Sequence, residues 1–175
     1  MKHNLPEWEL TIVTEQVDVD AFLEWVDGID GMVSIDTETR GLDWTQHSFT
    51  RLVQFADDRC SWAVPTVWWG RPLMRALSTI RDKGLAVAFW NAGFDMHALE
   101  GDGFPVPHWH QVVDGYILHH LLGPHLRHGL KGVAAEELGR WATVGEAKLK
   151  HEMGLHGWTW DTVPVDWPAY WQYGC

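Results

Sequence analysis

Apolar and polar residues alternate along much of the first 90 positions, with the period-two pattern that is typical of half-buried β-strands. On this pattern we predict strands in residues 9–16, 31–38, 51–56 and 60–66, with the DDR sequence at 57–59 as the turn between the last two. Residues 85–90 (LAVAFW) are apolar throughout, which is typical of a strand buried on both faces of a sheet.

Helical spacing of apolar residues dominates the rest of the chain. The first predicted helix covers residues 21–29, with Asp18 and Asp20 as candidate caps, and the second covers residues 71–84, with Gly84 as a candidate C-cap. Further helices are predicted in residues 91–101, 112–122, 128–138 and 167–174. Early strands, followed by one buried strand among helices, indicate an α/β fold with a mixed central sheet flanked by helices.

The composition is that of one folded domain. The chain has 175 residues, of which 46% are hydrophobic, so we treat residues 1–175 as a single unit. It contains no apolar run near the ~20 residues of a membrane span and no basic-then-apolar leader. We therefore expect a cytoplasmic protein without a membrane partner. The two cysteines, Cys60 and Cys175, lack the spacing of a metal site or a disulfide framework.

The chain is acidic, with 24 acidic against 13 basic residues and a net charge of −11. This excess of negative charge argues against a protein that binds nucleic acid on a basic surface, where affinity comes from counterion release. It does not exclude a nucleic-acid substrate, because carboxylates can bind divalent cations that then attract phosphate. The 13 tryptophans serve either packing or base stacking.

Asp36 and Glu38 stand two residues apart at the end of the strand predicted in residues 31–38. Residues i and i+2 of a strand point to the same face of the sheet. Two carboxylates held together beside a core raise each other's pKa unless a cation compensates, and ligation by oxygen alone points to Mg²⁺ or Mn²⁺. Taken alone, the same pair is also typical of a solvated strand end.

Asn91 and Asp95 follow the buried strand at a spacing of four residues. If Asn91 begins a helix, both side chains lie on one helical face. Asp95 then points across the carboxyl edge of the sheet, where Asp36 and Glu38 emerge and where α/β sheets bind ligands. Asn91 can also be a plain helix cap, and the two roles are compatible.

Five segments stand in a fixed order along the chain: SIDTETRGLDW, WNAGFDMHAL, VVDGYILHHLL, RHGLKGVAAEELG and YWQYG. Their order and spacing resemble the DEDD superfamily of 3′–5′ exonucleases, which is named for four acidic residues. Within this superfamily the chain resembles the proofreading domain of DNA polymerase I, in the form found in bacteriophage polymerases. The resemblance covers residues 30–175 and implies a ribonuclease H-like fold.

The resemblance implies a metal-binding role for three acidic residues. Asp36 would bridge two divalent cations, Mg²⁺ or Mn²⁺. Glu38 would bind the first cation and hold the attacking water, and Asp95 would help to hold the second through a water. Such a pair of cations activates water and stabilises the leaving oxygen, so that the product would be a nucleoside 5′-monophosphate.

The resemblance also implies substrate contacts. Thr37 would hold the 3′ end, Leu42 would wedge between the last bases, and Asn91 would lie near the terminal nucleotides. The last motif of the family, Tyr-x-x-x-Asp, matches Tyr173, whose hydroxyl would orient the nucleophilic water. A tyrosine in an aromatic-rich helix is also typical of a core residue, and Tyr170 does not fit the motif because a glycine stands four residues after it.

The aspartate of this motif would lie two positions beyond Cys175, so the sequence reads as truncated within its last motif. Loss of that ligand would weaken the first cation and slow hydrolysis. The aspartate could be supplied by the rest of a longer polymerase, by a separate chain, or by the remainder of a gene that a protein-splicing element interrupts. The α-carboxylate of Cys175 could also substitute for it, although a helix turns position i+2 away from position i+4. Asp114 is expected to be a helix cap and Asp166 a solvated turn residue. His119 and His120 are expected to face different directions, without forming a zinc site.

Three functions follow from these observations. The favoured one is a proofreading-type, metal-dependent 3′–5′ exonuclease that acts on single-stranded DNA 3′ ends in a bacterial or phage-infected cell. The second is a catalytically incomplete fragment that binds DNA ends or docks against a polymerase chain. The third is a ribonuclease D-like exoribonuclease, since the choice between DNA and RNA depends on contacts near the terminal sugar.

Overall fold

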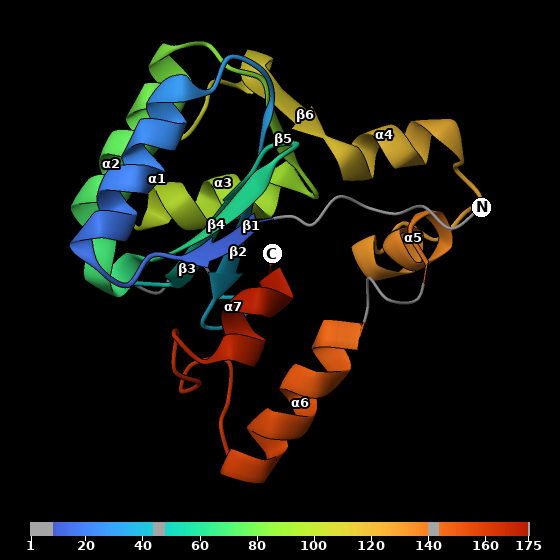
Figure 1. Ribbon diagram of the computed structural model, residues 1–175. Coiled ribbons are helices and arrows are strands. Elements are labelled where there is room, and N and C mark those ends of the chain that lie inside the picture. The colour runs from blue at the N-terminus through green and yellow to red at the C-terminus, as the bar shows by residue number, and fades with distance from the viewer. Residues whose placement is uncertain (1–8, 44–47, 140–143, 175) are drawn as a thin grey trace.

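The computed structural model describes residues 9–43, 48–139 and 144–174. Six strands form one mixed sheet in the order β1-β4-β3-β2-β5-β6 (Figure 1). Strands β2, β3 and β4 pair in antiparallel fashion, whereas β1, β5 and β6 join their neighbours in parallel. The bounds are β1 Glu9–Ile12, β2 Val33–Thr39, β3 Thr50–Ala56, β4 Cys60–Pro65, β5 Val87–Phe89 and β6 Val112–Asp114.

Helices cover both faces of this sheet, which confirms the predicted α/β class. Helices α1 and α2 lie together on one side, and α6 and α7 lie on the other (Figure 1). None of the helices in the described ranges is both long and apolar enough to cross a lipid bilayer. The helices are α1 Gln16–Gly28, α2 Thr66–Asp82, α3 Ala92–Gly101, the 3₁₀ turn η1 Trp109–Gln111, α4 Gly115–Leu122, α5 Leu130–Glu137, α6 Val144–His156 and α7 Pro168–Gly174.

Several element bounds differ from those expected. Helix α1 begins at Gln16, before the predicted caps. Asp18, at the third helical position, still caps the helix start, because its carboxylate accepts the backbone amides of Thr14 and Glu15. Strand β6 was missed because its three residues are too few to show alternation, and its sequence was assigned to the following helix. Helix α2 begins at Thr66, earlier than the predicted residue 71, and ends at Asp82; the candidate cap Gly84 follows at a φ of +70°.

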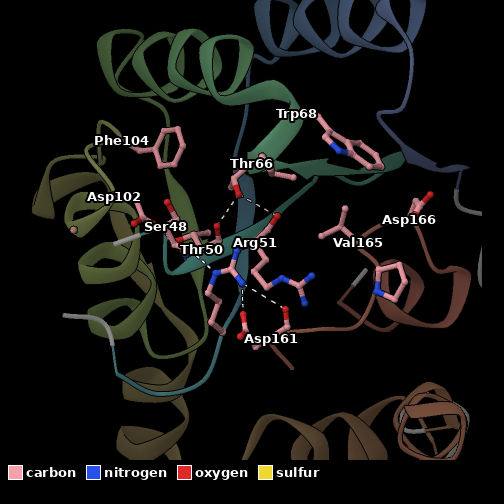
Figure 2. Close-up of a pocket in the computed structure, with 14 residues that line it drawn as sticks. Ser48, Thr50, Arg51, Thr66, Trp68, Asp102, Phe104, Asp161, Val165 and Asp166 are labelled. Atoms are coloured by element: carbon pink, nitrogen blue, oxygen red, sulfur yellow. Dashed lines mark hydrogen bonds and ion pairs between the residues drawn. The ribbon is translucent and has the colours of Figure 1, made fainter. Parts of the chain in front are cut away.

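Arg51 joins the sheet to the carboxyl-terminal part of the chain. This arginine of β3 is 9% exposed, and its guanidinium donates to the backbone carbonyls of Trp160 and Val163 at 2.5 Å each. The same group lies 5.3 Å from the ring centroid of Tyr170 in α7, within cation–π range. Figure 2 shows Arg51 in the wall of a cavity of about 670 Å³, with Thr50, Thr66 and Asp161 among the other lining residues.

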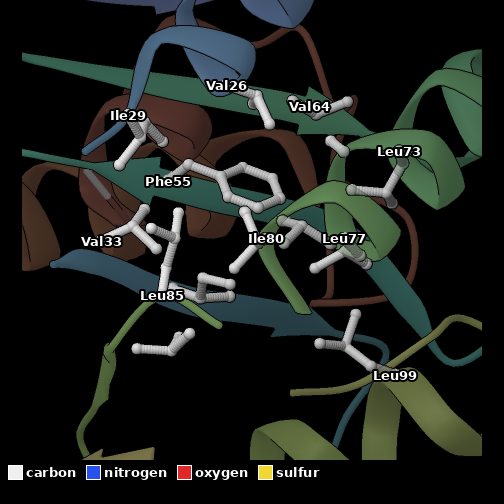
Figure 3. Packing of buried hydrophobic residues seen from close by; sticks show 14 of the residues in the cluster. Val26, Ile29, Val33, Phe55, Val64, Leu73, Leu77, Ile80, Leu85 and Leu99 are labelled. Atoms are coloured by element: carbon white, nitrogen blue, oxygen red, sulfur yellow. The ribbon is translucent and has the colours of Figure 1, made fainter. Parts of the chain in front are cut away.

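Strand β3 is buried on both faces, so two hydrophobic clusters share it. Val53 and Phe55 pack with α1 and α2 in the larger cluster, of which Figure 3 labels Val26, Leu73, Leu77 and Ile80. Leu52 points to the opposite face and packs against residues of α6 and α7, including Leu149 and Tyr170. Helix α7 is therefore held against the second face of the sheet.

Candidate active site

Asp36 and Glu38 lie on the face of the sheet that α7 covers. Residues along β2 alternate between buried and partly exposed, and both carboxylates fall on the partly exposed side. Glu38 pairs with Leu52 of β3, and Asp36 pairs with Gln54. Cross-strand partners share a face, and Leu52 packs in the same cluster as Tyr170 of α7. The prediction that the two carboxylates share one face is confirmed.

Asp95 reaches β2 from the first turn of α3 and is 3% exposed. Its Oδ1 accepts the backbone amide of Thr37 at 3.1 Å and the hydroxyl of Thr37 at 2.6 Å. Strand β5 pairs with β2 only at Val33 and Ser34, so it does not reach the amide of Thr37 farther along β2. The carboxylate of Asp95 accepts that amide instead. Asp95 is thereby fixed beside the residue that separates Asp36 from Glu38.

The electrostatics of the site are those of crowded, poorly hydrated carboxylates. Burial and, to a smaller extent, the charge of Asp36 raise the pKa of Glu38 to about 8, although the Lys131 ammonium opposes the change. Burial and the charge of Asp36 also raise the pKa of Asp95, against the hydrogen bonds from Thr37. Burial raises the pKa of Asp36 as well. A divalent cation would relieve this repulsion.

The residues present fit a divalent cation by charge and by donor type, since carboxylate oxygens suit Mg²⁺ or Mn²⁺. As the side chains stand, no three His, Cys, Asp or Glu residues of the described ranges surround a common point. Asp95 turns one carboxylate oxygen to the amide and hydroxyl of Thr37. The metal-ligand roles therefore stay predictions. Cys175, whose carboxylate was a candidate substitute ligand, lies outside the described residues.

Helix α7 carries Tyr173 beside this site. The side chain is half-buried, and its ring centroid lies 6.0 Å from that of Trp160. Burial and, to a smaller extent, the charge of Glu38 raise the pKa of its hydroxyl, against a hydrogen bond with Lys131. Tyr170 is fully buried beneath Arg51, which agrees with its exclusion from the motif. The catalytic role of Tyr173 stays a prediction.

The predicted substrate residues occupy different environments. Leu42 is 85% exposed, and Asn91 is exposed at the start of α3 in the left-handed region, with a φ of +72°, a conformation that asparagine tolerates. Thr37 is buried and gives both its amide and its hydroxyl to Asp95. Substrate contact by these three residues stays a prediction.

Asp114 is a helix cap, as expected, and it serves two helices. Its carboxylate accepts the amides of Asn91 and Ala92 at the start of α3, at 3.1 and 2.9 Å. It also accepts the amide of Tyr116 in the first turn of α4 at 2.9 Å. Asp114 thus sets the position of the helix that carries Asp95. Asp166 is exposed, as expected of a turn residue.

Replacing Asp114 by alanine is expected to lower the free energy of unfolding by about 1–3 kcal/mol, because two helix starts lose their acceptor. Urea denaturation followed by circular dichroism measures the change. Asp58→Ala is the matched control, because that side chain is 90% exposed on the β3–β4 turn, and its loss should cost less than about 0.5 kcal/mol. Equal losses in the two variants would contradict the capping role.

Sequence reasoning missed two features near the site. Lys131 was assigned only to an amphipathic helix, yet its Nζ lies 4.9 Å from the ring centroid of Tyr173. The histidines also differ from expectation: the Nδ1 atoms of His119 and His128 are 2.6 Å apart, and the ring of His120 stacks on His128 with centroids 3.4 Å apart. His119 and His120 thus meet the same partner, because the chain folds back after α4. Spacing along one helix could not show that return.

Comparison with known proteins identifies the family. A family model described as 3′–5′ exonuclease matches residues 10–160, a range that includes Asp36, Glu38 and Asp95. The DNA polymerase of Mycobacterium phage D29 is 25% identical over 181 aligned positions, which cover 94% of this chain and 29% of the polymerase. The chain therefore spans less than a third of the length of that relative.

Solved structures share the fold at low identity. Ribonuclease D from Trypanosoma brucei is 16% identical, with a TM-score of 0.72 over 96% of this chain and 61% of that chain. The Nibbler EXO domain of Aedes aegypti is 11% identical, with a TM-score of 0.70 over 98% and 83% of the two chains. Ribonuclease D from Escherichia coli is 16% identical, with a TM-score of 0.65 over 95% and 40%.

These likenesses confirm the ribonuclease H-like exonuclease fold that the resemblance implied. The family model covers most of the chain, including strand β2 with Asp36 and Glu38 and helix α3 with Asp95. The chain therefore belongs to the 3′–5′ exonuclease family of the DEDD superfamily.

Proposed function

We propose that this chain removes nucleoside 5′-monophosphates from the 3′ ends of single-stranded DNA, as a proofreading exonuclease does. The observation that carries this proposal is that Asp95 is hydrogen-bonded to Thr37, between Asp36 and Glu38, and that burial and the charge of Asp36 raise the pKa of Glu38 and of Asp95, in a chain of the 3′–5′ exonuclease family. DNA is favoured because the sequence match is to a phage DNA polymerase at 25% identity, whereas the likeness to ribonuclease D is one of fold at 16%.

Each residue of the site has a separate task in this proposal. Asp36, Glu38 and Asp95 would hold two divalent cations, which would supply the Lewis acidity needed to activate water and to stabilise the leaving oxygen. Glu38 and the hydroxyl of Tyr173 orient the attacking water from the face of the sheet that α7 covers. Thr37 holds Asp95 in place through the two hydrogen bonds described above.

The substrate side is formed by exposed residues. Leu42 contacts the terminal bases, and Asn91 lies at the start of α3 near the terminal nucleotides. Both side chains are accessible, and a frayed single strand offers unstacked bases to such apolar contacts. Because the net charge is −11, we expect tight binding of the strand to require the divalent cations.

RNA is the second candidate substrate, and the fold likeness to ribonuclease D and to Nibbler favours it. The test uses 5′-labelled DNA and RNA single strands of one sequence with Mn²⁺. The proposal predicts stepwise 3′ shortening of DNA, with a kcat/KM at least about tenfold above that for RNA. Faster shortening of RNA would replace DNA by RNA as the substrate. Binding of DNA ends without cleavage would overturn the exonuclease proposal in favour of a catalytically incomplete fragment.

The affinity for Mn²⁺ is expected to rise between about pH 6 and pH 8. Cations bind ionised carboxylates, and the raised pKa of Glu38, about 8, means that this group holds a proton in the metal-free protein at neutral pH. Metal binding must therefore release protons, which becomes easier as the pH rises. Isothermal titration calorimetry in two buffers with different heats of ionisation measures the release.

Glu38→Gln is the control for this titration, because it removes the group with the raised pKa without a large change of shape. The variant should bind Mn²⁺ weakly, with a flatter dependence on pH. The proposed ligand role of Glu38 would be contradicted if Mn²⁺ binding to the parent chain released no protons. It would also be contradicted if Mn²⁺ binding released equal numbers of protons from the parent chain and the variant.

A further inference from the structure

We propose that Lys131 is a positioning residue for the exonuclease reaction, and that its ammonium holds the ring of Tyr173 in place. The inference rests on the proposed role of Tyr173 in orienting the attacking water. Lys131 lies in the first turn of α5, whereas Tyr173 lies near the end of α7. The contact therefore links two helices whose relative position sets the direction of the phenol.

The contact has cation–π geometry. The Nζ of Lys131 lies 4.9 Å from the ring centroid of Tyr173, inside the roughly 6 Å range of this interaction. A second aromatic ring, that of Trp160, lies 6.0 Å from Tyr173 between centroids. Helix α7 has only seven residues, and a helix this short depends on such tertiary contacts for its position.

The ammonium is itself anchored by a third helix. Glu146 of α6 accepts Lys131 at 2.9 Å, and its side chain is only 23% exposed. The same carboxylate oxygen accepts Lys150 at 2.6 Å, from the next turn of α6. Glu146 therefore holds two lysines, of which Lys131 also contacts the tyrosine ring and Lys150 is 62% exposed. Lys131 thus couples α5, α6 and α7 at one point.

The expected effect is on turnover rather than on substrate binding. A hydroxyl that orients water must be held to within about 0.5 Å of its productive position. Residues that orient a catalytic group from one contact away contribute about 10- to 100-fold to activity. We therefore expect Lys131→Met to lower kcat by this factor, with a KM within about twofold of the parent value.

Two variants make the test specific. Lys131→Arg keeps a cation that can stack on the ring, so it should restore kcat to within about threefold of the parent chain. Lys150→Met removes the other partner of Glu146 without touching Tyr173, so it should leave kcat and KM within about twofold. Thermal unfolding of each variant checks that the fold is retained.

A double-variant cycle shows whether Lys131 acts through the tyrosine. In the Tyr173→Phe background the hydroxyl is gone, so Lys131→Met should cause no further loss of kcat. If the double variant instead loses kcat by the product of the two single-variant factors, the inference is wrong. A rise of KM at unchanged kcat would overturn it as well, because it would show that Lys131 binds the phosphates of the strand directly.

A measurement without turnover separates this inference from the proposed function. The chain has three tyrosines, so the ring signals of Tyr173 in a ¹³C-tyrosine NMR spectrum can be assigned with the Tyr173→Phe variant. Lys131→Met should shift these signals, whereas Lys150→Met should leave them in place. Shifted signals in a chain that cleaves neither DNA nor RNA would mean that the proposed function fails while the positioning contact stands. Unshifted signals would overturn the contact whatever the activity.

Discussion

Replacing Asp36 by alanine should abolish the 3′ shortening of single-stranded DNA and at the same time stabilise the metal-free protein. Asp36 is the proposed shared ligand of both cations, and loss of about 4 kcal/mol of transition-state stabilisation corresponds to a roughly 10³-fold slower reaction. Its charge also raises the pKa of Glu38 and of Asp95, so that its removal relieves a repulsion in the folded state.

The stability gain should depend on pH in a defined direction. A carboxyl group whose pKa is higher in the folded state than in the unfolded state costs stability as the pH rises through the folded value. In the folded chain, the pKa values of Asp36, Asp95 and Glu38 are all raised above those of free carboxyl groups. Without metal, the parent chain should therefore lose thermal stability from about pH 5 to pH 8, and Asp36→Ala should lose less.

Asp166→Ala is the control for both measurements, since that carboxylate is exposed and lies in the loop before α7. It should leave the rate and the pH dependence of the melting temperature near those of the parent chain. Residual activity in Asp36→Ala equal to that of the parent would contradict the assignment of Asp36. A melting temperature of Asp36→Ala below that of the metal-free parent at pH 8 would contradict the repulsion.

Arg51→Leu should cause a large loss of stability, although the residue lies outside the carboxylate site. The guanidinium is nearly buried, and its removal leaves the carbonyls of Trp160 and Val163 without their donor. It also removes the cation above the ring of Tyr170. We expect a loss of about 2–4 kcal/mol in urea denaturation, together with lower exonuclease activity, because the freed segment leads into α7.

Arg59→Leu is the matched control, because its side chain is 85% exposed on the β3–β4 turn. It should change the free energy of unfolding by less than about 1 kcal/mol. If Arg51→Leu were no less stable than Arg59→Leu, the anchoring of the carboxyl-terminal part by Arg51 would be wrong.

Local patterns were sufficient to predict strands β1 to β5 and the placement of the two carboxylates on β2, whereas strand β6 and helix α6 were not predicted. The alternation in residues 31–38 predicted β2 and the common face of Asp36 and Glu38, and the register with β3 agrees. Both features depend on the period of a strand, which neighbouring residues reveal. The helix that presents Asp95 was also predicted, since the buried strand before it ends at a residue suited to a helix start.

Contacts between distant segments could not be predicted in the same way. Arg51 bonds to carbonyls more than 100 positions away, and no local pattern indicates that an arginine in a strand will be buried there. Lys131 looks like an ordinary surface charge of the helix predicted in residues 128–138 until α7 brings Tyr173 against it, and Glu146 lies where no helix was predicted. The second bond of Asp114, to the start of α3, depends likewise on the pairing of β5 with β6.

The most direct test of the shared site is a crystal of this chain soaked with Mn²⁺ and measured at the manganese absorption edge. We expect an anomalous peak about 2.1 Å from a carboxylate oxygen of Asp36, in a position that Glu38 and, directly or through a water, Asp95 also reach. Manganese bound away from Asp36, or carboxylates of Asp36 and Asp95 that approach no common ion, would contradict the account.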